Sequence, residues 1–286
     1  MSNRSKKVKA PRVTKAAIYA SFGIEYRKGK ILAPEFGWIN PVLINGNSKL
    51  GKGVWTFSTL AANKAYNLTI NGKEYRVCGT CPCHCPGCYA CSGCYLFYST
   101  KQSLARKTII ARDYLDFLTR AIKAQIIADK ITICRIHASG DFFSLAYLLA
   151  WKDIIKSNPE TVFWTYTKVQ EFENAFDDLS NANIVKSLID CNGLRGLNYG
   201  PAAYIIQLYN ALKAAGKNVY ICRCGIDKNQ HCTNCHGCAI NDYVLFLEHG
   251  TSYNPETDPA FPALKALIES QPRNIATESA LTIAAD

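Results

Sequence analysis

Seven cysteines lie within seventeen residues between Cys78 and Cys94, together with one histidine, two prolines and three glycines. Thiolate sulfur is a ligand of zinc and of iron–sulfur clusters, and loops of two or three residues allow several sulfurs to reach one metal centre. This density exceeds what ordinary packing requires. The first cysteine group therefore predicts a metal site.

A second group of cysteines lies nearer the end of the chain. Cys222 and Cys224 are followed by the run Cys232-Thr-Asn-Cys235-His-Gly-Cys238, which has the spacing C-x2-C-x2-C. This run, with one or both of the earlier cysteines, supplies a full thiolate ligand set for an iron–sulfur cluster or for zinc. The spacing leaves open which of the two earlier cysteines is a ligand.

The composition favours a globular protein of a reducing compartment. Of 286 residues, 48% are hydrophobic and 19% are charged, and no apolar run approaches the roughly 20 residues of a membrane helix. The basic N-terminus lacks the apolar segment of a secretory signal, so we expect a cytoplasmic protein with no membrane partner. In that compartment, fourteen cysteines indicate metal binding rather than disulfides.

The segment that joins the two cysteine groups alternates strands and helices, which is the pattern of parallel βαβ units with right-handed crossovers. The expected strands are Ile131–His137, Thr161–Thr167, Asn183–Leu188, Asn218–Cys222 and, beyond the second group, Asp242–His249. The expected helices are Lys101–Lys130, Ser144–Lys156, Val169–Leu179, Pro201–Ala215 and, in the tail, Ala263–Ser270. The sequence predicts an α/β sheet or an open barrel with its site at the carboxyl ends of the strands.

The residues before the first cysteine group are expected to form β structure. Val54–Leu60 has the composition of a strand, and Tyr66–Ile70 and Lys73–Val77 flank the turn Asn71-Gly72 as a hairpin. Residues 31–50 are rich in Gly, Pro and Asn and are expected to be irregular. The hairpin leads straight into the cysteines, so the first group is predicted to hang from a strand end.

Within the first group, Cys81, Cys85 and Cys88 have the spacing C-x3-C-x2-C. Three thiolates on a 4Fe–4S cluster leave one iron without a protein ligand, and that iron can bind a substrate or a cofactor. Here the sequence resembles the radical S-adenosylmethionine superfamily. In that superfamily the three cysteines hold such a cluster, S-adenosylmethionine chelates the open iron, and reductive cleavage yields a 5′-deoxyadenosyl radical.

This resemblance implies roles for individual residues. Cys81, Cys85 and Cys88 would be the cluster ligands, and Ser139-Gly140-Asp141 would take the place of the glycine-rich motif that binds the methionine amino group. It also implies an α/β fold with a partial, open βα barrel of the radical S-adenosylmethionine type. The second cysteine group is similar to the auxiliary-cluster modules of some radical enzymes.

A closer resemblance is to a cysteine-rich family of phage and mobile-element proteins. The shared features are Cys88-Tyr89-Ala90, the stretch Arg135–Ser144, the aromatic strand Phe163–Thr167, and a late cysteine group followed by a strand that ends in His249. The likeness covers about residues 75–250. It implies the same fold without a defined substrate and, for a phage-encoded chain, a place in the host cytoplasm.

Asp141 is the predicted catalytic residue. A carboxylate at the C-terminal end of a parallel strand, freed by Gly140, faces the site, so we favour a cofactor or substrate role over capping of the next helix. His137, a lone histidine near a strand end, is expected to be a hydrogen-bonded structural residue. Trp164 and Tyr166 share one face of their strand and are expected to line the core or the barrel.

The chain is predicted to contain five parts. These are a basic arm (1–30), an N-terminal β segment (31–77), a radical-SAM-like βα core (78–222), an auxiliary metal-cluster module (223–250) and a tail (251–286).

Residues 1–30 hold most of the net charge of +11. They contain Arg4, Lys6, Lys7, Lys9, Arg12, Lys15, Arg27, Lys28 and Lys30, against Glu25 alone. Such an arm either binds a polyanion through counterion release or is a solvated tail. Nucleic acid is therefore a candidate partner.

The preferred hypothesis is an enzyme with two 4Fe–4S clusters that cleaves S-adenosylmethionine, takes electrons from a donor and acts on an unknown substrate, for which the basic arm makes nucleic acid a candidate. A second hypothesis is a non-catalytic zinc protein that binds nucleic acid through its arm, with Cys78 and Cys81 paired to Cys91 and Cys94 as zinc knuckles. A third keeps the clusters for electron transfer or sensing. Under the preferred hypothesis Cys78, Cys83, Cys91 and Cys94 have no assigned role.

Overall fold

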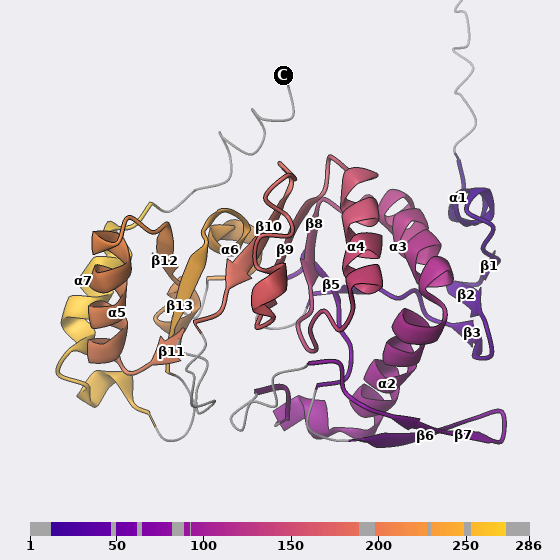
Figure 1. Ribbon diagram of the computed structural model, residues 1–286, viewed down its shortest axis with the longest axis horizontal. Coiled ribbons are helices and arrows are strands. Elements are labelled where there is room, and N and C mark those ends of the chain that lie inside the picture. Colours follow the sequence, from indigo (N-terminus) through magenta and orange to yellow (C-terminus); the bar gives the residue numbers. More distant parts are fainter. Residues whose placement is uncertain are drawn as a thin grey trace, which may run out of the picture.

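The computed structural model has a mixed α/β fold built from helices and several small sheets (Figure 1). It describes residues 13–46, 50–61, 65–81, 89–91, 93–188, 198–227, 230–248 and 253–272. Within these residues there are seven α-helices, and no sheet closes into a barrel. Among the described helices, none has both the length and the hydropathy of a membrane span.

The largest sheet contains five short strands. They are β4 (Ile44–Asn45), β5 (Trp55–Phe57), β8 (Ile133–Ile136), β9 (Val162–Thr167) and β10 (Ala182–Lys186). Their order is β10-β9-β8-β5-β4, and all are parallel except β4, which pairs antiparallel with β5. Because the carboxyl ends of parallel strands lie at one edge, the loops after β5, β8 and β9 emerge together.

Helices cover one face of this sheet. Helix α2 (Tyr98–Asp113) leads into α3 (Leu115–Asp129), and α3 lies beside α4 (Leu145–Lys156), as Figure 1 shows. Phe57 and Phe163 are fully buried in the same core as Trp151 of α4. Since neighbouring residues of a strand point to opposite faces, Trp164 packs in a separate cluster on the other side.

A second sheet continues the parallel series. It consists of β11 (Tyr199–Gly200), β13 (Tyr243–Leu247) and β12 (Val219–Ile221), and it packs with α5 (Ala202–Ala214) and α7 (Phe261–Ser270). Lys186 N donates to Asp242 O over 2.7 Å, and Asn198 Nδ2 donates to both Lys186 O and Val244 O. These bonds join the end of β10 to β13.

The predicted hairpin is confirmed. Strands β6 (Tyr66–Ile70) and β7 (Lys73–Val77) pair antiparallel around Asn71 and Gly72, both of which have positive φ. The hairpin packs Leu68 and Val77 against α2.

Two expectations were wrong. Residues 31–50, predicted to be irregular, contain β2 (Lys30–Ala33) and β3 (Gly37–Ile39), which with β1 (Tyr26–Arg27) form a three-stranded antiparallel sheet. The strand β2 alternates exposed and buried residues, but it is too short for that period to stand out among Gly and Pro.

The prediction of a helix at Val169–Leu179 is also wrong. The segment forms a 3-10 turn at Gln170–Phe172 followed by further turns, in which bonds such as Ala175 N to Phe172 O span three residues. Phe172 and Phe176 pack edge-on against Phe142, so the apolar spacing serves a compact turn rather than a helix.

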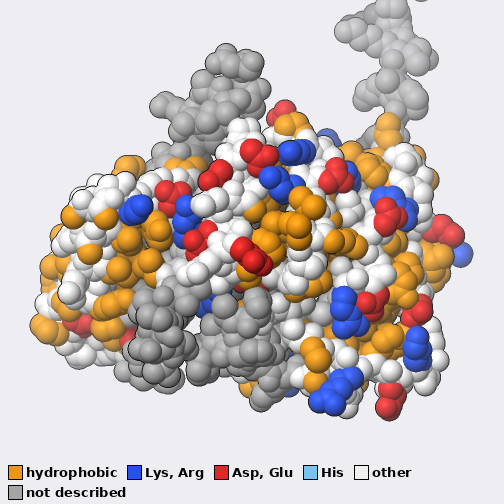
Figure 2. Space-filling view, in the orientation of Figure 1, with side chains coloured by type: hydrophobic (Ala, Val, Ile, Leu, Met, Phe, Trp, Pro, Cys, Tyr) orange, Lys and Arg blue, Asp and Glu red, His pale blue; other side chains and the backbone are white. Residues whose placement is uncertain are grey.

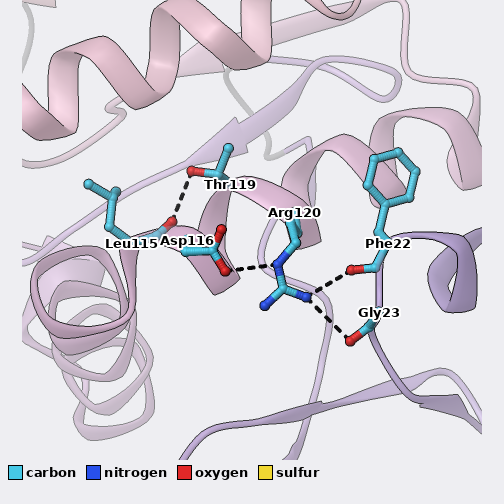
Figure 3. Close-up of polar contacts among 6 residues, drawn as sticks. All are labelled: Phe22, Gly23, Leu115, Asp116, Thr119 and Arg120. Carbon is cyan, nitrogen blue, oxygen red and sulfur yellow. Dashed lines mark hydrogen bonds and ion pairs between the residues drawn. The ribbon is translucent and has the colours of Figure 1, made fainter.

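The described part of the predicted basic arm, from residue 13 on, folds against α3. Helix α1 (Lys15–Ser21) begins at Thr14, whose side chain accepts a hydrogen bond from Ala17 N. At its other end, Arg120 donates to the carbonyls of Phe22 and Gly23 and to Asp116 (Figure 3). Residues 1–12 lie outside the described residues.

Candidate metal centre

The first cysteine group follows β7 in the chain and starts beside the loop that leaves the carboxyl end of β5. Thr80 N donates to Leu60 O over 3.0 Å, and the hydroxyls of Thr59 and Thr80 are 2.7 Å apart. Both threonines are buried. The residue before Cys81 is thereby fixed to the loop that leaves β5.

The Ser139-Gly140-Asp141 loop lies against the same two threonines. Ser139 Oγ donates to Thr59 O over 2.9 Å, and Asp141 N donates to Thr80 Oγ1 over 3.3 Å. Gly140 has φ +86°, and a Cβ there would lie 1.9 Å from Thr59 Oγ1. Only glycine permits this approach. The loop after β8 and the start of the first cysteine group are therefore neighbours.

Asp141 joins the ends of β8 and β9. Its carboxylate accepts hydrogen bonds from Phe142 N, Thr167 Oγ1 and Lys168 N, at 2.7 to 2.9 Å, and the residue is 3% exposed. Burial raises the pKa of Asp141 to about 6, while the three hydrogen bonds oppose that shift. The alternative role as a helix cap is wrong, because Ser144 caps α4 by accepting from Tyr147 N.

His137 is buried and hydrogen bonded. Its Nε2 lies 2.9 Å from Tyr147 Oη, and its backbone has φ +59°. Burial lowers the pKa of His137 to about 3, and the nearby Arg135 adds to this effect. The ring is held neutral in the aromatic core.

The structure describes four of the seven cysteines of the first group. Cys83, Cys85 and Cys88 lie outside the described residues, so the predicted triplet is represented by Cys81 alone, which is partly exposed. Cys78 and Cys94 are exposed and Cys91 is partly exposed, and none of these three is in a disulfide.

The late cysteine group is brought together by the fold. Hydrogen bonding with Cys222 raises the pKa of Cys224 to about 12, a hydrogen bond with Cys232 opposes this, and the charge of Cys235 adds to it. Burial raises the pKa of Cys238 to about 12, with further contributions from Cys232 and Cys235. Each of the five predicted ligands therefore interacts with at least one other member of the group.

This group lies on the face of the large sheet opposite α3 and α4. Cys232 and Cys238 pack with Trp164 and Tyr166 of β9, and the short helix α6 (Gly237–Ile240) contacts both β9 and β10. Asn183 Nδ2 of β10 donates to Cys238 O and Asn241 O, each over 2.9 Å. The sheet therefore forms a floor beneath the cysteines.

Two tyrosine hydroxyls face the sulfurs. Tyr166 Oη donates to Cys238 Sγ over 2.7 Å, and Tyr220 Oη lies 3.3 Å from Cys235 Sγ. The sequence predicted Tyr166 only as a lining residue and gave no signal for Tyr220, since these contacts join residues 72 and 15 positions apart.

The donor set at the late group suits a thiophilic metal. Thiolates bind zinc and iron–sulfur clusters in preference to hard cations. As they stand, no three His, Cys, Asp or Glu side chains of the described residues converge in the arrangement of a metal site. The five thiols nevertheless interact pairwise, and they come from the end of β12 and from the turns before β13.

Comparison with known proteins gives consistent matches to one family. A family model described as Gene product 88 matches residues 41–252, more than half of the chain. The Gene 88 protein of Mycobacterium phage L5 is 56% identical over 36 residues, which cover 13% of this chain and 15% of that protein. The Gene 88 protein of Mycobacterium phage D29 is 36% identical over 61 residues, covering 18% and 25% respectively. These alignments span a quarter or less of each relative, and no solved structure matches the chain.

Proposed function

The chain belongs to the phage Gene product 88 family, and on that premise we propose that it is an iron–sulfur enzyme of the radical S-adenosylmethionine type. The observation that carries the proposal is the contact between two loops. Gly140 lies against Thr59 and against Thr80, the residue before Cys81, so the proposed cofactor motif contacts the residue that precedes the first proposed cluster ligand.

The residues of this region have distinct proposed roles. Cys81, Cys85 and Cys88 would ligate a 4Fe–4S cluster, which when bound supplies the electron for reductive cleavage of S-adenosylmethionine. The Ser139-Gly140-Asp141 loop would hold the methionine amino group of the cofactor. Asp141 is anchored by three donors, so it would position the loop as well as contact the ligand.

The order of the parallel strands supports the partial barrel. The strands β5, β8, β9 and β10 are sequential neighbours, and the bond from Lys186 N to Asp242 O extends the series into β13 and β12. The sheet is open on one side in this arrangement, and an open sheet of parallel strands is what a partial βα barrel requires.

The late group would hold a second cluster or a zinc ion. The pKa of Cys224 is raised by its hydrogen bond with Cys222 and that of Cys238 by burial, and neighbouring cysteines add to both shifts, so the thiolate form is disfavoured at these two residues. A bound cation reverses that penalty, because a coordinating thiol is deprotonated.

The test is anaerobic purification of the full chain followed by analysis of iron, sulfide and zinc. We expect roughly eight iron and eight sulfide per chain, from two 4Fe–4S clusters. After reduction, the protein should form 5′-deoxyadenosine from S-adenosylmethionine. Colourless protein with stoichiometric zinc and no 5′-deoxyadenosine would contradict the proposal.

Two matched variants separate the enzyme from a zinc protein. Cys85→Ala should abolish 5′-deoxyadenosine formation, whereas Cys94→Ala should retain it, because Cys94 has no role in the proposed cluster. If Cys78, Cys81, Cys91 and Cys94 instead form zinc knuckles, Cys94→Ala should lose zinc.

A non-catalytic nucleic-acid-binding function is the second candidate. It is favoured by the position of residues 1–12, which precede the folded helix α1 and carry five Lys or Arg. Deletion of residues 1–12 should then remove a salt-sensitive affinity for nucleic acid and leave 5′-deoxyadenosine formation unchanged.

A further inference from the structure

Two tyrosines reach the late cysteine group from different parts of the fold. Tyr166 lies on β9 and donates to Cys238 Sγ over 2.7 Å, whereas Tyr220 lies on β12 with its hydroxyl 3.3 Å from Cys235 Sγ. Tyr220 is buried, and its ring packs with Cys222 and Cys235. Both hydroxyls therefore lie at a sulfur, that of Tyr220 from within the core and that of half-buried Tyr166 from the face of the sheet.

Each tyrosine is backed by an arginine. The Arg135 guanidinium lies 5.2 Å from the centroid of the Tyr166 ring, as a cation–π contact. Arg223 is buried and donates from Nε to Tyr220 Oη over 3.3 Å, which leaves the Tyr220 O–H free to point at sulfur. Arg223 also donates to Gln271 O, so its guanidinium is fixed in place.

We propose that Tyr166 and Tyr220, each backed by its arginine, form an outer shell that stabilises negative charge on the sulfurs of a metal–thiolate centre. This inference rests on the proposed metal site of the late group. Four thiolates around zinc or around a 4Fe–4S cluster carry net negative charge, and burial of that charge requires hydrogen-bond donors or nearby cations. The structure supplies a hydroxyl donor and a nearby guanidinium at each of the two tyrosines.

The arrangement suits charged sulfur better than neutral thiols. A hydrogen bond is strongest when its acceptor is ionised, and an arginine behind the donor adds attraction at longer range. Partners of this kind orient metal ligands, and their loss typically weakens metal binding by about 10 to 100-fold. Tyr166 and Tyr220 are thus positioning residues that act through Cys238 and Cys235.

The test uses the full chain with Co²⁺ as the probe, because its thiolate charge-transfer band reports on the sulfur orbitals. The band to be scored is the one that Cys235→Ala abolishes, which separates the late group from the first. Affinity is measured by competition with a chelator. Tyr166→Phe and Tyr220→Phe should each weaken Co²⁺ binding by about 10-fold and move the band to longer wavelength, because sulfur loses a hydrogen bond.

Tyr147→Phe is the matched control. Tyr147 is fully buried, and its hydroxyl lies 2.9 Å from His137 Nε2, on the other side of the large sheet from the late group. This variant should bind Co²⁺ like the wild type with an unmoved band. Arg135→Met should reproduce part of the Tyr166→Phe shift, and Arg135→Lys should restore it because the charge remains.

The outcomes distinguish the two levels of the proposal. Wild-type protein that shows no Co²⁺ band dependent on Cys235, and retains no zinc or cluster there, overturns the metal site itself. Normal binding in the wild type with unchanged affinity and band position in both tyrosine variants overturns only the outer shell. Equal losses in Tyr147→Phe would also overturn it, since they would show a general effect on stability.

Discussion

The two cysteine groups are held by the fold in different ways. At the first, the structure fixes the frame around Cys81, through short contacts of Thr59, Thr80 and Gly140 at the ends of parallel strands. At the late group, the thiols themselves are gathered over the opposite face of the sheet, with tyrosine hydroxyls and an asparagine amide around them. At the first group the described contacts are made by residues next to Cys81, whereas at the late group they are made by the candidate ligands themselves. The two groups should therefore respond to different substitutions.

The largest expected effect is at the frame of the first group. Gly140→Ala places a Cβ 1.9 Å from Thr59 Oγ1 and 2.7 Å from Thr80 Oγ1, at φ +86°. The clash and the backbone strain together should lower the free energy of unfolding by about 3 kcal/mol, measured by urea denaturation.

Gly72→Ala is the control for this prediction. Gly72 has φ +80° with nothing within 4 Å of an added Cβ, so only the conformational penalty of roughly 1 kcal/mol applies. Equal losses in the two variants would show that the contact between the loops is not tight.

Asp141 should give the next largest effect, as a dependence of stability on pH. Burial raises its pKa to about 6 from a usual 3.8, so the folded state binds the proton more tightly than the unfolded chain does. Unfolding then releases a proton between about pH 4 and pH 6. The free energy of unfolding should therefore fall by about 2 to 3 kcal/mol from this group as the pH rises through that window.

Urea titrations of the wild type and of Asp141→Asn between pH 4 and pH 7 measure this contribution. The asparagine variant cannot titrate at this position, so the wild type should gain about 2 to 3 kcal/mol in the free energy of unfolding relative to the variant as the pH is lowered from 7 to 4. Parallel pH profiles would contradict the raised pKa.

Asn183→Ala tests the floor beneath the late group. Its Nδ2 donates to Cys238 O and Asn241 O, and removal leaves both carbonyls without that donor. We expect a loss of about 2 kcal/mol in the free energy of unfolding, together with faster release of metal from the late group.

The matched control is Asn181→Ala, two residues earlier in the chain. Asn181 Nδ2 donates to the carbonyls of Ile155, Asn158 and Thr161, which lie near the end of α4 rather than at the cysteines. It should cost similar stability without changing metal release. If both variants release metal equally fast, the amide of Asn183 has no specific role at the late group.

The sequence was most informative where structure is local. Asn71-Gly72 dictates the hairpin, and the apolar runs of β8 and β9 identify buried strands, because turn chemistry and short apolar periods act within a few residues. The spacing of the late cysteines also predicted a set that the fold brings together. The strand β2 and the turns after Val169 were missed, because tertiary packing decides them.

The surroundings of the candidate ligands could not be predicted in the same way. Tyr166 meets Cys238, and Arg135 lies over the Tyr166 ring, only because β8 and β9 pair in parallel and α6 packs across β9 and β10. No local pattern encodes these contacts. The prediction for Asp141 was incomplete for the same reason. Its place at a strand end was predictable, but its donors on the neighbouring strand follow from the register of β8 and β9.

The smallest expected effect concerns the helix that follows the Asp141 loop. Ser144→Ala removes the cap that accepts from Tyr147 N, and Thr14→Ala removes the equivalent cap of α1, each with a bond of 3.2 Å. Each should cost about 1 kcal/mol in the free energy of unfolding. The amides of residues 141–144 should exchange faster with solvent in Ser144→Ala only, because the cap of α4 also ends that loop. Unchanged exchange there would show that the contacts of Gly140 and Asp141 alone hold the frame of the first group, independently of the helix behind it.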